Sequence, residues 1–385
     1  MKPVYFDHAA TTPVDPRVFE GMTPFFCERF GNPSEPHRLG REARSAVDEA
    51  RARVAALLGA GENEIVFTAG GTEADNLALF GSLARLQPGH LVVSAVEHPA
   101  VMEAARALNG RGWDVDYVPV DGHGVVDPEA YRAAFRDDTR LVSVMTANNV
   151  VGTVQPVAEL ARIAHEKGAL FHTDAVQAVG SLPVDVDELG VDMLSLSGHK
   201  LHGPKGVGAL YVRRGTRLQP LLHGGGQERR LRSGTENVPG IVGLGVAMTL
   251  ACEAMPEVRP RLERLRDRLV AGVLARVPEV TLLGHPTDRL PGNAAFAVRY
   301  VEGESLLLRL DARGFTVSSG SACAAGSDEP SPVVQALGVR PEDAHGSLRV
   351  SLGRENTEEE VDAFLDALPP IVDELRRMSP LYAKR

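Results

Sequence analysis

The chain holds 385 residues, more than one typical domain, which predicts a large unit joined to a smaller one. With 43% hydrophobic and 24% charged residues, the composition is that of a globular protein with a substantial core and excludes a disordered or low-complexity chain. The formal net charge of -10 argues against a broad surface for nucleic acid or anionic membranes and favours a small substrate.

The first residues, MKPVYFDHAATTP, lack the apolar stretch of a signal peptide. We find no apolar run that approaches the roughly 20 residues of a membrane-spanning helix, so we expect a cytoplasmic protein without membrane contact. The first long element is an amphipathic helix over residues 39–57, because apolar residues recur there at three- and four-residue steps and stop before Gly59. We expect this helix to pack on a sheet or against a partner.

Between Glu64 and Arg214, short apolar runs alternate with helical patterns. This alternation is typical of a mostly parallel sheet with crossover helices and predicts an α/β fold. The predicted strands are EIVFTA, HLVVSAVE, TRLVSVMTA, ALFHTDA, DMLSLS and GALYVRR.

Near residues 255–260 the pattern changes to a long charged helix, where we expect a second domain to begin. Its predicted strands are NAAFAVRY, FTVSS and SLRVSLG. The last helix begins at a Thr357/Glu360 capping box and is expected to be interrupted at Pro369-Pro370. We place the large domain at 16–257 and the small domain at 1–15 and 258–385.

Lys200 follows DMLSLS, just past the carboxyl end of a predicted parallel strand, where open α/β sheets bind ligands. The chain has only five lysines, yet Lys200 and Lys205 share the turn GHKLHGPKG, which favours a chemical role. A lysine at this position can clamp a phosphate, carry surface charge or act as a Schiff-base nucleophile. The turn does not match a Walker phosphate loop, because Pro204 stands where that loop has its lysine and no Ser or Thr follows.

A pyridoxal phosphate site needs, besides the lysine, a carboxylate for the pyridine nitrogen, a phosphate cradle and a ring that covers the cofactor. Asp174 ends the strand ALFHTDA and is the candidate carboxylate, although it can equally cap the next helix. His98 follows HLVVSAVE and can stack on the cofactor, although a lone histidine there is more often structural.

The candidate phosphate cradle is FTAGGTEADN, which runs from a strand through Gly70-Gly71 into a helix opened by Thr72. Backbone N–H groups at such a helix start bind phosphate, and glycines allow close approach. Taken alone, Gly-Gly-Thr also makes a common turn. Ser197 and His199 lie close to Lys200 in the sequence and can add donors to the same phosphate.

These motifs, taken together, resemble those of the cysteine desulfurases of the NifS/IscS kind, which are class V, fold-type I pyridoxal phosphate enzymes. The resemblance runs from YFDHAATTPVDPRV to SLRVSLGRENTEEEVD and so covers almost the whole chain. It implies a fold-type I transferase, with a large domain around a mostly parallel sheet and a smaller C-terminal α+β domain. The segments that carry it are SLSGHKLHGPKGVGALYVRR, FTAGGTEADN, VEHPAV, TDAVQAVG, GGGQERRLRSGTENVPGIVG and SSGSACAAGS.

The resemblance also implies cofactor contacts. Lys200 would be joined to the cofactor's aldehyde, Asp174 would face the pyridine nitrogen, and His98 would stack on the ring. Gln177 would contact the phenolic oxygen. Thr235 would reach the phosphate from a second subunit, which implies a homodimer. The phosphate would also be held by Gly71, Thr72, Ser197 and His199.

On the substrate side, the resemblance places Asn149 near the substrate amine and Arg349 on the substrate carboxylate, which arginine can bind with two nitrogens. Arg354 is a nearby alternative. Two positions depart from the family pattern. Val150-Val151 replaces a common Glu-Ile pair, and Arg230 stands where a glycine is common, so the local loop conformation is open.

The three cysteines are far apart and odd in number, which favours neither a disulfide framework nor a metal cluster. Cys323 lies in SSGSACAAGSDEPSP, whose small and turn-forming residues predict an exposed, mobile loop. Cys27, beside two phenylalanines, and Cys252, in an apolar helix, are interpreted as packed thiols.

By the resemblance, the Cys323 thiolate takes the sulfur of L-cysteine as a persulfide, leaves L-alanine, and passes the sulfur to an acceptor protein such as an iron–sulfur scaffold. Lys200 would move the Cα proton, and His98 would act as acid or base. A selenocysteine lyase or class V aminotransferase on the same scaffold would not require Cys323. A nonenzymatic assembly scaffold is a further alternative.

Overall fold

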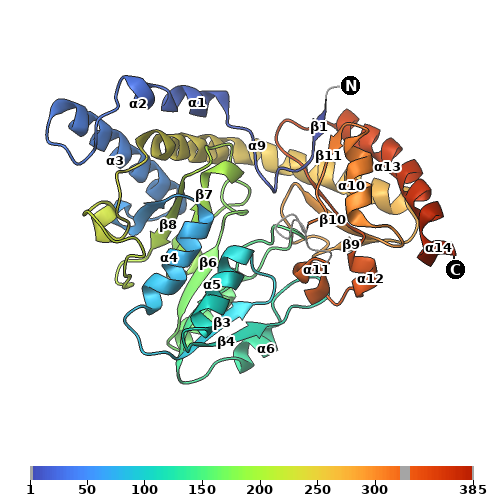
Figure 1. Ribbon diagram of the computed structural model, residues 1–385, viewed down its shortest axis with the longest axis horizontal. Coiled ribbons are helices and arrows are strands. Elements are labelled where there is room, and N and C mark those ends of the chain that lie inside the picture. The colour runs from blue at the N-terminus through green and yellow to red at the C-terminus, as the bar shows by residue number, and fades with distance from the viewer. Residues whose placement is uncertain (1–2, 321–329, 384–385) are drawn as a thin grey trace.

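The computed structural model describes residues 3–320 and 330–383 (Figure 1). Cys323 therefore lies outside the described residues. A seven-stranded sheet forms one part of the molecule, and a three-stranded sheet with its helices forms the other, with the N-terminal strand beside the latter (Figure 1).

The large sheet is mostly parallel, as predicted. Only β8 runs antiparallel to both of its neighbours, β2 and β7. The central strands are buried on both faces, which explains their continuous apolar runs. In spatial order the strands are β2 (Ile65–Thr68), β8 (Gly208–Val212), β7 (Met193–Ser197), β6 (Leu170–Asp174), β5 (Thr139–Ser143), β3 (His90–Ser94) and β4 (Asp114–Val118).

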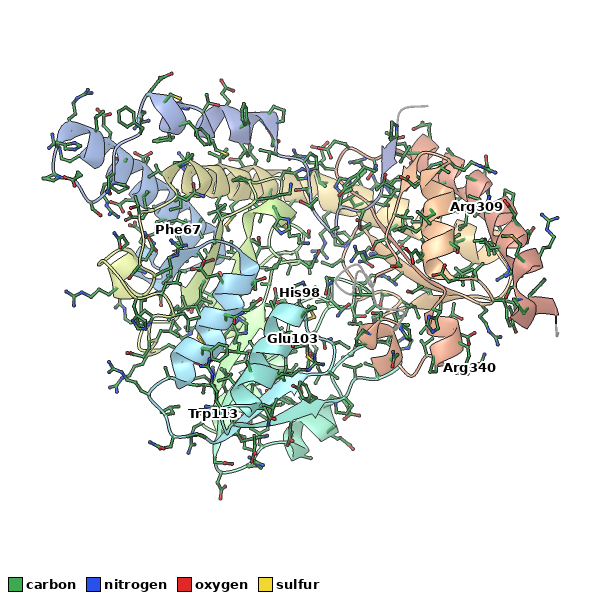
Figure 2. The ribbon with its side chains drawn as sticks, viewed as in Figure 1. Phe67, His98, Glu103, Trp113, Arg309 and Arg340 are labelled. Carbon is green, nitrogen blue, oxygen red and sulfur yellow. The ribbon has the colours of Figure 1, made fainter. Side chains whose placement is uncertain are left out.

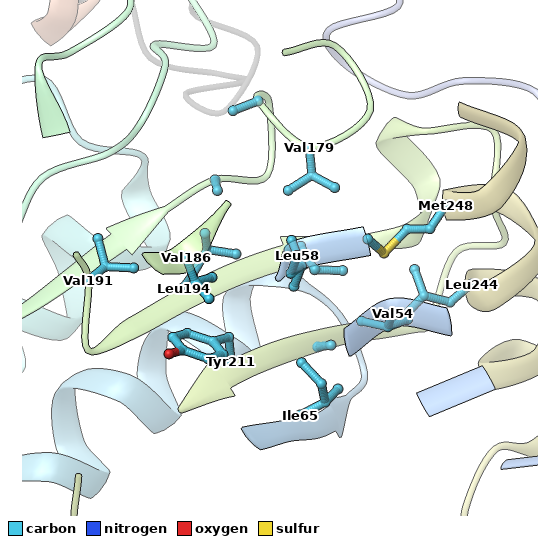
Figure 3. Packing of buried hydrophobic residues seen from close by; sticks show 14 of the residues in the cluster. Val54, Leu58, Ile65, Val179, Val186, Val191, Leu194, Tyr211, Leu244 and Met248 are labelled. Atoms are coloured by element: carbon cyan, nitrogen blue, oxygen red, sulfur yellow. The ribbon is translucent and has the colours of Figure 1, made fainter. Parts of the chain in front are cut away.

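Helices cover both faces of the large sheet. On one face, Val54 and Leu58 of α3 and Leu244 and Met248 of α9 pack over Leu194 and its neighbours (Figure 3). On the other face α4 and α5 pack on the strands. The helices around this sheet are α1 (Pro16–Met22), α2 (Pro24–Cys27), α3 (Arg38–Leu58), α4 (Gly71–Leu83), α5 (Pro99–Asn109), α6 (Pro128–Ala133), α7 (Val157–Glu166) and α8 (Val186–Leu189).

The predicted helix over 39–57 is confirmed as α3. It ends at Gly59, whose φ of 71° is the left-handed conformation that glycine adopts easily. The prediction that Cys27 is a packed thiol is wrong. Phe25 takes the buried side of the short helix α2, so Phe26 and Cys27 are exposed, while Cys252 is partly buried.

One continuous helix, α9 (Val238–Arg276), links the two parts. Its first half packs into the core of the large sheet and its second half into a separate core, so the pattern change near 255–260 falls inside the helix. Contrary to expectation, α9 has the length and apolar composition of a membrane-crossing helix, alone among the described helices. Its contacts with α1 and α3 are those of a core helix.

The second core lies over an antiparallel sheet in the order β12 (Ser347–Ser351), β10 (Asn293–Val298) and β9 (Val280–Leu283). The N-terminal strand β1 (Val4–Tyr5) pairs in parallel with β11 (Phe315–Thr316), and Val4 and Phe6 pack in this core. The domain limits at 16–257 and 258–385 stay a prediction. The remaining helices are α10 (Gly303–Asp311), α11 (Pro332–Ala336), α12 (Pro341–Ala344), α13 (Glu358–Met378) and α14 (Pro380–Ala383).

The last long helix, α13, has the predicted capping box. The Thr357 hydroxyl accepts a hydrogen bond from the Glu360 N–H, and the Glu360 carboxylate accepts one from the Thr357 N–H. The expected interruption at Pro369-Pro370 is wrong, because the helix continues through both prolines. Apolar residues before and after the prolines stay buried in the second core, which holds the helix together.

Candidate active site

A cavity opens at the carboxyl ends of β5, β6 and β7, the edge where open α/β sheets bind ligands. Arg349 and Gly320 reach it from the C-terminal part of the chain, and Ala9 and Ala10 from the N-terminal segment. His98 stands at the start of α5, on the side of the large sheet that faces the C-terminal part (Figure 2). The predicted site residues that line the cavity are Gly71, Thr72, His98, Asn149, Asp174, Gln177, Ser197, His199, Lys200 and Arg349.

Lys200 ends a single 3-10 turn, Gly198–Lys200, directly after β7. Its Nζ donates hydrogen bonds to the carbonyl oxygens of Ala9, at 2.6 Å, and Ala10, at 2.7 Å. The Gln177 side chain donates to the same Ala9 oxygen at 2.9 Å. The HAATTP segment therefore holds the lysine amine at the cavity wall.

Asp174 ends β6 and is 5% exposed. Its Oδ1 accepts a hydrogen bond from the Val176 N–H at 2.8 Å within a turn, and the next helix begins only at Val186, so Asp174 does not cap it. Burial raises the pKa of the Asp174 carboxyl, while the nearby His98 and Lys200 act against that rise. A cationic pyridine nitrogen would favour the charged carboxylate further.

His98 has both roles that were considered for it, a structural role and a place in the site. Its Nδ1 accepts a hydrogen bond from the Ala100 N–H at 3.1 Å and so caps α5, while the ring lines the cavity. Burial, more than any other cause, lowers the pKa of His98. A neutral ring with Nδ1 as acceptor carries its proton on Nε2.

The phosphate cradle is formed where β2 passes into α4 through Gly70-Gly71. A Cβ on Gly71 would lie 2.8 Å from the Val176 side chain, so glycine is required for this close approach. His199 Nδ1 lies 3.1 Å from the Thr11 hydroxyl, and burial lowers the pKa of His199 to about 4. The start of α4 thus presents backbone N–H groups beside the Thr72 and Ser197 hydroxyls, a donor set that fits a phosphate.

Arg349 is buried at the opposite wall of the cavity. Its Nη1 donates to the Asn149 carbonyl at 2.9 Å, and its Nη2 pairs with Asp7 at 2.8 Å. Its buried Nε has no hydrogen-bond partner among the described residues. Arg354 pairs instead with Asp15, at 2.6 Å, and lines a neighbouring hollow. The geometry therefore favours Arg349 over Arg354 for a substrate carboxylate.

One predicted site residue in the described part of the chain does not join the others. Thr235 is exposed in the loop before α9 and does not line the cavity, and Cys323 lies outside the described residues. Arg230, which stands where a glycine is common, has a φ of 68°, in the left-handed region that favours glycine, and nothing in the structure explains the arginine. The departing Val150 and Val151 are buried in an apolar cluster.

Sequence reasoning missed Asp75 and Met145, which also line the cavity. Asp75 follows Thr72 by three residues on α4, and helical spacing puts both side chains on one face. That periodicity could have identified it. Met145 carries no comparable signal.

Comparisons with known proteins agree with this geometry. The aminotransferase class-V family matches residues 4–364. The cysteine desulfurase IscS of Methanosarcina thermophila is 53% identical over 100% of this chain and 95% of that protein. The cysteine desulfurase IscS of Dictyoglomus turgidum is 51% identical over 98% and 96%, respectively. A solved structure of a NifS-like protein superposes with a TM-score of 0.91 at 41% identity, covering 97% of this chain and 100% of that one.

Proposed function

Because this chain belongs to the aminotransferase class-V family and is a pyridoxal phosphate-dependent cysteine desulfurase, we propose that its cavity directs sulfur from L-cysteine to the thiol of Cys323 and leaves L-alanine. A selenocysteine lyase or an aminotransferase is not favoured, since the relatives at about half identity are cysteine desulfurases.

The donor set of the cavity supports residue roles for the cofactor. Lys200 would join the cofactor's aldehyde, Asp174 would face its ring nitrogen, and His98 would cover the ring. When bound, pyridoxal phosphate supplies an electron-withdrawing ring that stabilises negative charge at the substrate Cα. The phosphate and phenolic oxygen would be held by Gly71, Thr72, Ser197, His199 and Gln177.

The chain's own residues would orient the substrate and move its protons. Arg349 would bind the substrate carboxylate, with Asn149 beside the amine. The Lys200 amine would take the proton from Cα, and His98 is placed to act as a second acid or base. Arg349 is 4% exposed, which strengthens its attraction for a carboxylate.

The thiol of Cys323 would carry the sulfur. Gly320 lines the cavity, and Cys323 follows three residues later, so an extended chain could carry its thiol about 10 Å from that wall. Attack of the Cys323 thiolate on the substrate sulfur forms an S–S bond and breaks the substrate C–S bond. The carbon fragment keeps the electron pair and takes protons to become alanine.

Assembly and delivery are proposed on the family pattern. The exposed Thr235 would complete the phosphate cradle of a second copy, which makes the working unit a homodimer. The persulfide would pass to a sulfur-acceptor protein such as an iron–sulfur scaffold in the cytoplasm. Neither a membrane nor a nucleic acid is required as a partner.

The single observation that carries this proposal is the convergence of Lys200, Asp174 and Arg349 on one cavity beside Gly320. We expect Cys323→Ala to lose release of alanine and sulfide from L-cysteine while the cofactor absorbance is retained, because only the sulfur acceptor is removed. Both products are measured together in wild type and variant.

The matched controls are Cys27→Ala and Cys252→Ala, whose thiols lie outside the cavity and whose variants should keep turnover. Equal sulfide release by wild type and Cys323→Ala would refute the persulfide role of Cys323.

A further inference from the structure

A second buried aspartate lies on the cavity wall near Asp174. Asp75 is carried by α4, is 1% exposed, and lines the same cavity. Its Oδ1 is buried and has no hydrogen-bond partner among the residues that the structure describes. An ionised carboxylate in this position would lack the donors that a buried charge requires.

Three neighbouring strands supply a chain of polar side chains behind Asp75. His172 of β6 lies between the Ser143 hydroxyl of β5, 2.9 Å from Nδ1, and the Ser195 hydroxyl of β7, 3.0 Å from Nε2. The Ser195 hydroxyl also acts on the Asp75 carboxyl and partly opposes the rise of its pKa. Burial lowers the pKa of His172 to about 3, so its ring is neutral and supplies no cation, although Nε2 lies 3.6 Å from Asp75 Oδ1.

The two aspartates differ in the groups that face them. Asp174 has the Val176 N–H as a donor and the nearby His98 and Lys200 as potential cations. Asp75 has the Ser195 hydroxyl. Burial, and next the proximity of Asp174, raise the pKa of Asp75 well above its ordinary value. The titratable or charged groups around Asp75 are Asp174 and His172 of β6, Glu97 after β3, His98 at the start of α5 and Lys200 after β7.

We propose that Asp75 is a positioning residue that keeps its proton, so that Asp174 alone carries negative charge toward the ring nitrogen of the cofactor. Two buried carboxyls on one cavity wall repel each other when both are ionised, and the one with a backbone donor and Lys200 nearby ionises first. The Ser143–His172–Ser195 chain is neutral and supplies no positive charge for an ionised Asp75. The inference rests on the proposed cofactor site.

The first test uses the holoenzyme and the pH midpoint of its cofactor absorbance. Asp75→Asn keeps the shape and neutrality of a protonated carboxyl, so we expect the midpoint to move by less than about 0.3 pH unit. Asp174→Asn removes a real charge and should lower the midpoint by about 1 unit or more. A similar drop in Asp75→Asn would mean that Asp75 is charged and would overturn the proposal.

The second test uses cofactor-free protein and urea unfolding between pH 5 and pH 9. When the pKa of a carboxyl is higher in the folded state than in the unfolded state, the protein becomes less stable as pH rises above the unfolded value of about 3.9. Asp75→Asn lacks that loss, so its stability relative to wild type should increase with pH. Glu97, whose pKa burial raises to about 8, is present in both proteins, and Glu97→Gln introduced into both removes its titration from the comparison.

The matched control is Asp137→Asn, which removes an exposed carboxyl far from the cavity lining. A stability difference between Asp75→Asn and wild type that stays constant with pH would contradict a retained proton.

If Asp75→Asn fails to fold, infrared spectra of wild type with 13C-labelled aspartate decide the question. A protonated aspartate band at pH 7 that Asp174→Asn retains supports the proposal, whereas a band that Asp174→Asn loses, or no band in wild type, overturns it.

Failure of the proposed function is distinguishable from failure of this inference. A wild type without desulfurase turnover would refute the function, whereas the unfolding and infrared measurements need neither turnover nor cofactor.

Discussion

At the residue scale, the chemistry depends on which of two lysines in one turn reaches the cavity. Lys200 Nζ is held at the wall by two backbone carbonyls, whereas Lys205 is exposed. Lys200 is therefore the lysine that we expect to bind the cofactor, and Lys205 is not needed for that bond.

We expect Lys200→Ala to lose covalent attachment of the cofactor and to lower turnover by about 10²- to 10⁴-fold, the range for loss of a general base. Borohydride reduction followed by mass spectrometry of the intact protein measures the attachment. Lys205→Ala, the matched control, should still gain the mass of the reduced cofactor. Normal turnover in Lys200→Ala would refute the assignment of the lysine.

The candidate site was predictable where side chains follow strand ends. Lys200, Asp174 and His98 each follow a predicted strand, and parallel strands bring their carboxyl ends to one edge. Asp75 was missed because a polar residue early in a helix ordinarily faces water, and only tertiary packing buries it. The role of Cys323 stays a prediction.

At the element scale, a buried ion pair joins α3 to the turn at 228–230. Arg51 Nη1 lies 2.9 Å from one Glu228 oxygen, which also accepts from the Phe67 N–H at 2.8 Å. Both charged side chains are nearly inaccessible to water. The turn itself is strained, because three consecutive residues other than glycine have positive φ: Glu228, Arg229 and Arg230.

We expect Arg51→Met to lower the free energy of unfolding by about 3–5 kcal/mol, because it leaves the Glu228 carboxylate buried without its cation. The double variant Arg51→Met/Glu228→Gln should recover part of that loss. Urea unfolding measures both variants. If the double variant is less stable than the single one, the buried charge is not the cause.

The long, regular elements were predictable and the marginal ones were not. The six predicted strands of the large sheet are all present, but β4 was missed because its sequence DVDYV lies at the exposed sheet edge and is polar. Strand β1 has two residues, too few for a periodic signal, whereas the equally short β11 lies within the predicted strand FTVSS. The helices α9 and α13 pass through their prolines because buried apolar faces on both sides hold them.

At the scale of the whole molecule, the predicted role of Thr235 requires a second copy of the chain. Thr235 is exposed and does not line the cavity of its own chain. The loop that precedes it is anchored by the Glu228 ion pair and by Arg232, which lies 2.9 Å from Glu73 of α4. A loop held in this way leaves Thr235 exposed, as its predicted contact with a second copy requires.

If Thr235 acts across the dimer, two inactive chains should complement each other. Lys200→Ala removes the lysine, and Thr235→Ala removes one hydrogen bond to the phosphate, which should weaken cofactor retention by roughly tenfold or more. In a mixed dimer, one site combines the intact Lys200 of one chain with the intact Thr235 of the other. Such dimers, purified through two different tags, should retain about one cofactor per dimer and about half of wild-type turnover.

The matched control pairs Lys200→Ala with the double variant Lys200→Ala/Thr235→Ala, which has no intact lysine in either chain and should remain inactive. Cofactor content after dilution and alanine release are measured on both mixed dimers. Mixed dimers of the two single variants that hold cofactor no better than Thr235→Ala alone would place Thr235 in its own chain's site. The outward loop would then have to fold back, which its contacts with Glu73 and Arg51 oppose.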